Sequence, residues 1–97
     1  MRILMLLVGL ALAACAQQPR IPVLIVDGAN NHDWRVLSEY LQSILAATDK
    51  FRVDVSTSPP PAAAAEAWEH WRPDFSRYKV VVNNFIPPND RFVGQFR

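Results

Sequence analysis

The architecture of this chain follows from an unbroken apolar run, Ile21-Pro22-Val23-Leu24-Ile25-Val26. A run of this kind, bounded by turn-forming residues, is typical of a strand buried on both faces, as strands in parallel sheets are. Pro22 is tolerated because it stands at the beginning of the strand. The run is followed at once by Asp27-Gly28-Ala29-Asn30-Asn31-His32-Asp33, which predicts a polar loop at the carboxyl end of that strand.

The segments after this loop alternate between helical and extended patterns. From Trp34 to Thr48 apolar residues recur at spacings of three and four, which predicts an amphipathic helix with Asn31 or Asp33 as its cap. Segment 62–71 is rich in alanine and predicts a shorter helix. Strands are expected near 22–27, 51–55 and 79–84, the last because of Val80-Val81-Val82.

This alternation favours an α/β fold, with a flavodoxin-like parallel sheet in the order 2-1-3 and flanking helices. Such sheets bind ligands beyond the carboxyl ends of their strands, where the strand order reverses. The polar loop and Asn83-Asn84 are therefore expected to face one crevice. Three strands and one long helix leave the third strand without a covering neighbour, so we expect an incomplete sheet from a truncated or frameshifted gene product.

The amino terminus has the pattern of an export signal. Met1 and Arg2 precede an apolar run, Ile3 to Leu12, that is shorter than the roughly 20 residues a membrane-spanning helix needs. Leu12-Ala13-Ala14-Cys15 follows and resembles the lipobox of bacterial lipoproteins. The resemblance implies cleavage before Cys15, lipidation of its thiol and attachment to a membrane. The alternative is an ordinary signal peptide that leaves a free thiol.

The location of the anchored protein follows from the residue after the cysteine. Ala16 stands where an aspartate would resemble an inner-membrane retention signal. We therefore expect a protein of the bacterial cell envelope, lipid-anchored in the outer membrane and facing the periplasm.

Composition excludes several partner classes. Ten Lys and Arg residues against nine Asp and Glu residues give a net charge of +1, so no basic surface for nucleic acid is expected. Hydrophobic residues make up 51% of the chain, a fraction that is typical of a globular protein. The single cysteine, Cys15, rules out an internal disulfide and leaves no cysteine nucleophile once it is lipidated.

The polar loop carries the candidate site residues. We expect Asp27, Asn31, His32 and Asp33 to line a polar, sugar-sized pocket, with His32 and Asp33 as candidate catalytic groups. The alternative is structural: Asn and Asp form turns and caps, and His32 is solvated. No metal or cofactor is expected, since the other histidine, His70, belongs to a different element. Tryptophans 68 and 71 are expected to pack in the core.

At this loop the sequence resembles the trehalose-utilisation (ThuA-like) family. The residues that carry the resemblance are Val23-Leu24-Ile25-Val26-Asp27-Gly28, then Asn30-Asn31-His32-Asp33-Trp34, Phe51-Arg52-Val53-Asp54-Val55, and Trp71-Arg72-Pro73-Asp74-Phe75-Ser76-Arg77-Tyr78-Lys79-Val80-Val81-Val82. The resemblance implies a fold similar to class I glutamine amidotransferases, a link to carbohydrate metabolism and a pocket-lining role for His32. Together with the export signal, it divides the chain into four expected segments: a lipoprotein signal peptide at 1–14, a tether at 15–20, the amino-terminal part of a ThuA-like domain at 21–86 and an irregular tail at 87–97.

The sequence departs from the family after the third strand. Asn83-Asn84-Phe85 is followed by Ile86-Pro87-Pro88, where the family continues with Asn-Gly and Trp-Pro. A site that needs those parts cannot be complete here. Two function classes remain: a lipid-anchored enzyme, or enzyme fragment, that acts on a carbohydrate, and a non-catalytic carbohydrate-binding or structural remnant.

Overall fold

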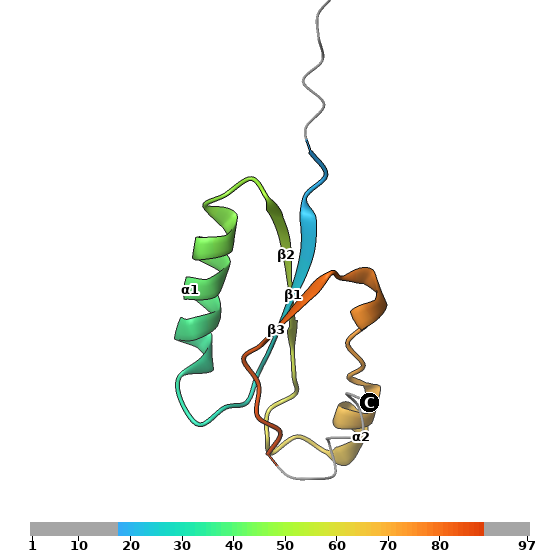
Figure 1. Cartoon of the computed structure of the whole chain (residues 1–97). Coiled ribbons are helices and arrows are strands. Elements are labelled where there is room, and N and C mark those ends of the chain that lie inside the picture. Colours follow the sequence, from blue (N-terminus) through green and yellow to red (C-terminus); the bar gives the residue numbers. More distant parts are fainter. Residues whose placement is uncertain (1–17, 89–97) are drawn as a thin grey trace, which may run out of the picture.

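The computed structural model of the protein describes residues 18–88 (Figure 1). The expected signal peptide, Cys15 and most of the expected tail lie outside the described residues. The described elements, in chain order, are strand β1 (Ile21–Asp27), helix α1 (Trp34–Ala46), strand β2 (Phe51–Thr57), helix α2 (Ala65–His70), the 3-10 helix η1 (Phe75–Arg77) and strand β3 (Val80–Asn83). Within residues 18–88, no helix is both long enough and apolar enough to cross a membrane.

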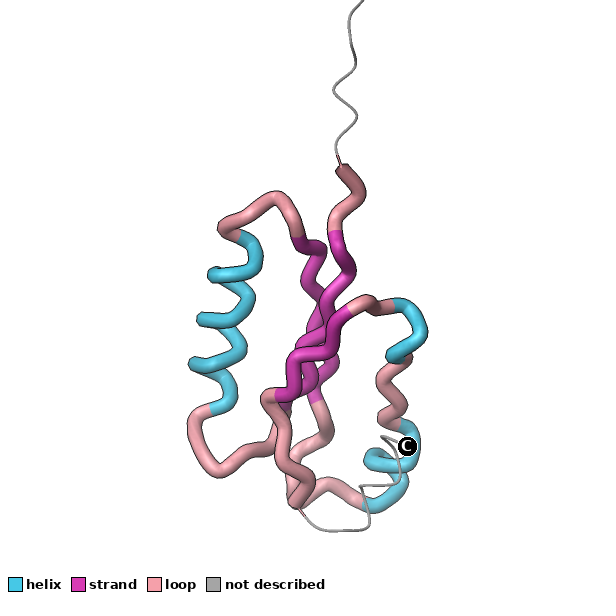
Figure 2. Tube along the Cα trace, viewed as in Figure 1, coloured by secondary structure: helices cyan, strands magenta, loops and turns pink. Residues whose placement is uncertain are grey.

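The three strands form a parallel sheet in the order β2-β1-β3, which confirms the predicted α/β fold and strand order. β1 pairs with β2 in a register that runs from Ile21↔Phe51 to Asp27↔Thr57, and with β3 from Val23↔Val80 to Val26↔Asn83. α1 covers one face of this sheet and α2 lies on the other (Figures 1 and 2). The arrangement brings the carboxyl ends of all three strands to one edge.

β1 is buried on both faces because it is the central strand between two layers of helix. Residues 23–26 are at most 3% exposed. On the α2 side, Leu24 and Val26 join a core cluster with Ala29, Trp68 and Phe85. Trp68 is fully buried, and the half-buried Trp71 packs against the same cluster, with the two rings edge to face and their centroids 5.8 Å apart, so the expected core packing of the tryptophans is confirmed.

α1 begins where the sequence predicts and ends slightly earlier, at Ala46. Its cap is Asp33, one of the two predicted candidates, whose carboxylate accepts the backbone N–H groups of Arg35 and Val36. The inward face of the helix contains a polar residue, Ser38, which is 3% exposed. Val36 and Tyr40 lie on the exposed side.

The connection between β2 and β3 differs from its prediction. A helix is expected over 62–71, but α2 is only Ala65–His70, because the backbone at Ala64 (φ −59°, ψ 150°) is not helical and Trp71 is already extended. Asp74 then caps η1 by accepting the backbone N–H and the hydroxyl of Ser76. These two hydrogen bonds lower the pKa of Asp74 below its ordinary value.

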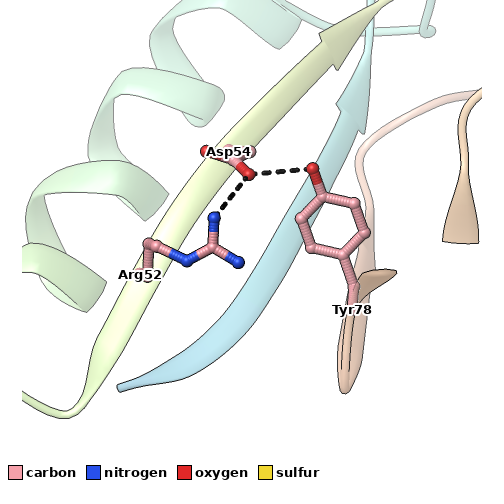
Figure 3. A network of polar contacts seen from close by, with 3 residues as sticks. All are labelled: Arg52, Asp54 and Tyr78. Atoms are coloured by element: carbon pink, nitrogen blue, oxygen red, sulfur yellow. Dashed lines mark hydrogen bonds and ion pairs between the residues drawn. The ribbon is translucent and has the colours of Figure 1, made fainter. Parts of the chain in front are cut away.

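Polar side chains of β2 hold the connection between β2 and β3 against the sheet. The Asp54 carboxylate accepts the Tyr78 hydroxyl at 2.8 Å and an Arg52 guanidinium nitrogen at 3.5 Å (Figure 3). Further along the strand, the Trp71 indole nitrogen donates to Ser56 Oγ at 3.0 Å. The hydrogen bond to Asp54, followed by burial, raises the pKa of Tyr78. β2 therefore serves as an anchor for the aromatic residues that flank α2 and η1.

Candidate functional site

A cavity of about 770 Å³ opens where β1 and β2 end. It is bounded by three loops: the one after β1, the one after β2 and the segment that follows β3. The lining residues are Gly28, Ala29, Asn30, Asn31, His32, Asp33, Trp34, Arg35, Thr57, Ser58, Pro60, Pro61, Ile86, Pro87 and Pro88. Its position at the carboxyl edge of the strands is where parallel sheets bind ligands.

The first two loops are brought together at Gly28. This residue has φ of +115°, a backbone conformation that residues other than glycine rarely adopt. A Cβ atom here would also lie 2.5 Å from the backbone nitrogen of Ser58. That nitrogen donates to the carbonyl of Asp27 at 2.8 Å, which extends the β1–β2 pairing into the loops. Glycine is therefore required for the two loops to approach as closely as they do.

A buried polar network lies beneath the cavity. The Ser38 hydroxyl donates to Asp27 Oδ2 at 2.5 Å, and the Asn84 amide donates to Ser38 Oγ at 3.0 Å. Asp27 is 2% exposed, and its other oxygen, Oδ1, has no hydrogen-bond partner among the described residues. Asp27 is not among the lining residues, so the structure separates it from the other three predicted ligand groups.

Asn84 connects this network to the loop above it. Its side-chain amide also donates to the Trp34 carbonyl at 3.0 Å, and its side-chain oxygen accepts from the Asn30 amide at 3.0 Å. The backbone adds two further contacts, Asn84 N–H to the Val26 carbonyl and Ile86 N–H to the Ala29 carbonyl, both at 2.9 Å. The chain that leaves β3 is thereby joined to the loop that leaves β1, and both contribute to the cavity wall.

Asn31 and His32 form a pair on the exposed rim of the cavity. The Nδ1 atom of His32 lies 2.9 Å from Oδ1 of Asn31. An amide oxygen only accepts hydrogen bonds, so Nδ1 acts as the donor in this contact and Nε2 takes no part in it. The backbone N–H of His32 donates to Asn30 Oδ1 at 3.3 Å, which orients the loop at this point.

His32 is followed by an acidic, an aromatic and a basic residue: Asp33, Trp34 and Arg35. Asp33 lines the cavity, but its Oδ1 is already used by the first turn of α1, at 3.2 Å from the Arg35 nitrogen and 3.3 Å from the Val36 nitrogen. The Arg35 guanidinium carbon lies 4.3 Å from the centre of the Trp34 ring, a cation–π contact.

Three of the predicted residues, Asn31, His32 and Asp33, thus share one cavity. Their roles as ligand-binding or catalytic groups stay predictions. Sequence reasoning missed Arg35 and Ser58. Arg35 follows directly after the predicted loop, and the Ser-Pro-Pro-Pro segment that contains Ser58 is a recognisable loop after β2. Within residues 18–88, no group of three or more His, Cys, Asp or Glu side chains is arranged to hold a metal ion.

These features define an α/β protein with a three-stranded parallel sheet and a ligand-sized cavity at the carboxyl ends of its strands. The fold is similar to the crystal structure of a ThuA-like protein from Parabacteroides merdae ATCC 43184, with a TM-score of 0.68 and 29% sequence identity. The match covers 80% of this chain and 28% of that one. No protein-family model matches the sequence, and no curated protein matches it. The structural likeness supports the ThuA-like family that the sequence motifs indicate.

Proposed function

We propose that the protein is a ThuA-like domain protein whose cavity binds a carbohydrate as part of carbohydrate utilisation. Size supports this proposal. The cavity volume of about 770 Å³ falls within the range of roughly 300–1,000 Å³ that is typical of small-molecule sites.

The observation that carries the proposal is the chemistry of the loop after β1. Sugar hydroxyls both donate and accept hydrogen bonds, and the loop offers an amide at Asn31 and an imidazole nitrogen, Nε2, at His32. Trp34 adds an aromatic ring to the same wall, which suits the apolar face of a sugar ring. The buried network through Asn84 holds this loop in place, so that binding need not order it.

Binding is tested by calorimetric titration of the full chain with glucose and with trehalose. His32→Ala is expected to weaken binding by about tenfold or more, while the free energy of unfolding in urea changes by less than about 0.5 kcal/mol, as for other exposed substitutions. His70→Ala is the matched control, because His70 is exposed on α2, outside the cavity lining, and among the described residues its ring bonds only to the Glu66 carbonyl. Unchanged affinity in His32→Ala would contradict the proposal.

We also propose that the protein is anchored to a membrane through lipidated Cys15, in the bacterial cell envelope and facing the periplasm. The sequence Leu12-Ala13-Ala14-Cys15 after an apolar run supports the proposal. Metabolic labelling with a palmitate analogue should mark the wild-type protein and leave Cys15→Ser unlabelled. Equal labelling of both proteins would end the idea, and fractionation of outer and inner membranes tests the expected location.

A further inference from the structure

The two charged side chains that line the cavity, Asp33 and Arg35, differ in whether their charge already has a partner. The negative charge of Asp33 is occupied by the amino terminus of α1, whose backbone N–H groups its carboxylate accepts. The positive charge of Arg35 is not occupied in this way. Among residues 18–88 the ion pairs are Arg20–Asp49 and Arg52–Asp54, so Arg35 has no described carboxylate partner.

The position of Arg35 suits a guanidinium that receives an anion. It lines the cavity, and it lies 4.3 Å from the centre of the Trp34 ring, which is part of the same wall. A ring beneath the guanidinium restricts its orientation and leaves its N–H edge available. That edge matches the oxygens of a carboxylate or a phosphate, to which arginine forms paired, charge-assisted hydrogen bonds.

We infer that the cavity selects a carbohydrate that bears an anionic group, a carboxylate or a phosphate, over the neutral sugar. Arg35 receives the anionic group, and the Trp34 ring and the Asn31–His32 pair contact the rest of the sugar. The inference rests on the proposed carbohydrate binding and specifies the class of carbohydrate.

The experiment is a calorimetric titration of the full chain with four probes: glucose, glucuronate, glucose 6-phosphate and inorganic phosphate. The two charged sugars are expected to bind at least about tenfold more tightly than glucose. Because screening weakens attraction between exposed charges, this advantage should shrink as salt is raised from low to physiological concentration. Inorganic phosphate alone should bind more weakly than glucose 6-phosphate, since it lacks the sugar ring.

Three variants test the role of Arg35. Arg35→Gln should remove the preference for charged sugars, so that glucuronate and glucose 6-phosphate bind it no more tightly than glucose does. Arg35→Lys should restore part of the preference, because it keeps the charge but not the planar fork. Arg77→Gln removes an equal charge from η1, outside the cavity lining, and should leave all affinities unchanged.

Each other outcome overturns the inference in a recognisable way. Equal affinity for glucose and the charged sugars overturns it and leaves the proposed function standing, whereas failure of all three sugars to bind overturns both. A preference that survives in Arg35→Gln shows that another group receives the anion. Inorganic phosphate that binds as tightly as glucose 6-phosphate shows that the cavity recognises the anion alone.

Discussion

The hydroxyl of Ser38 and the carboxylate of Asp27 form a hydrogen bond of 2.5 Å in the interior, between the first half of α1 and the last residue of β1. Both side chains are at most 3% exposed. A carboxylate this deeply buried is costly unless it is hydrogen-bonded, and Ser38 provides the bond that one of its oxygens makes. The pair explains why a helix with an apolar inward face carries a serine there.

Ser38→Ala should therefore lower the free energy of unfolding by about 1.5–3 kcal/mol, since it leaves both Asp27 oxygens without a described donor. Ser43→Ala is the control: Ser43 is exposed on the same helix, and among the described residues its hydroxyl bonds only to the Tyr40 carbonyl, so the loss of this hydroxyl should cost less than about 0.5 kcal/mol. Urea denaturation of the two variants measures the difference. Equal effects would show that the buried hydrogen bond contributes nothing.

Gly28→Ala should destabilise the protein severely. The backbone conformation at φ +115° alone costs a residue with a side chain about 1–3 kcal/mol, and the new methyl group would overlap Ser58. Part of this overlap is with the Ser58 backbone nitrogen, so adding Ser58→Ala to Gly28→Ala should not restore stability. Thermal denaturation of the single and double variants checks both statements, and a rescue by Ser58→Ala would mean that only the side-chain contact matters.

Two substitutions can separate the two roles of Asp33, which caps α1 and places a negative charge on the cavity wall. Asp33→Ala removes the cap of α1 and should cost about 1 kcal/mol of stability. Asp33→Asn keeps an acceptor oxygen at the cap and should cost much less, while it removes the charge from the cavity wall. If binding of a sugar is lost in Asp33→Asn although stability is retained, Asp33 contacts the ligand directly. A large loss of stability in Asp33→Asn would contradict the capping role.

The raised pKa of Tyr78 predicts a specific behaviour in alkali. A group whose pKa is higher in the folded state contributes stability that is complete below its ordinary pKa and is lost as the pH rises through the folded value. The phenolate absorbance of the folded protein should thus contain a late component, which disappears in Tyr78→Phe and remains in Tyr40→Phe. Asp54→Asn should move this component to lower pH, because it removes the negative charge beside the hydroxyl. An unchanged titration in that variant would exclude Asp54 as the cause.

The elements with strong periodic patterns could be predicted from the sequence. β1 is predicted because its residues are apolar without interruption, and α1 because its apolar positions repeat at helical spacing. The order of the strands follows from their alternation with helices. α2 is shorter than predicted because alanine favours a helix but provides no cap to define its beginning.

The site could be predicted only in part. The loop of Asn31, His32 and Asp33 is visible as a dense polar segment, and the cavity forms beside it. The network beneath it could not be predicted, because the contacts of Ser38 and Asn84 depend on how α1 and the end of β3 are placed in space. Asp27 illustrates the difficulty, since a polar residue next to a loop is equally compatible with a surface position and with a buried one.

The central position of β1 also has a consequence for how the protein is made. β1 is synthesised before both of its partners, since Ile21 pairs with Phe51 and Val23 pairs with Val80. Until those strands emerge, a nascent chain exposes an apolar β segment, which is the kind of segment that self-associates. Arg20 and Asp27 place a charge at either end of this segment, and Pro22 removes one backbone N–H donor within it. These features oppose pairing with other chains. We expect Asp27 to protect the nascent chain from aggregation before its carboxylate is ever buried against Ser38.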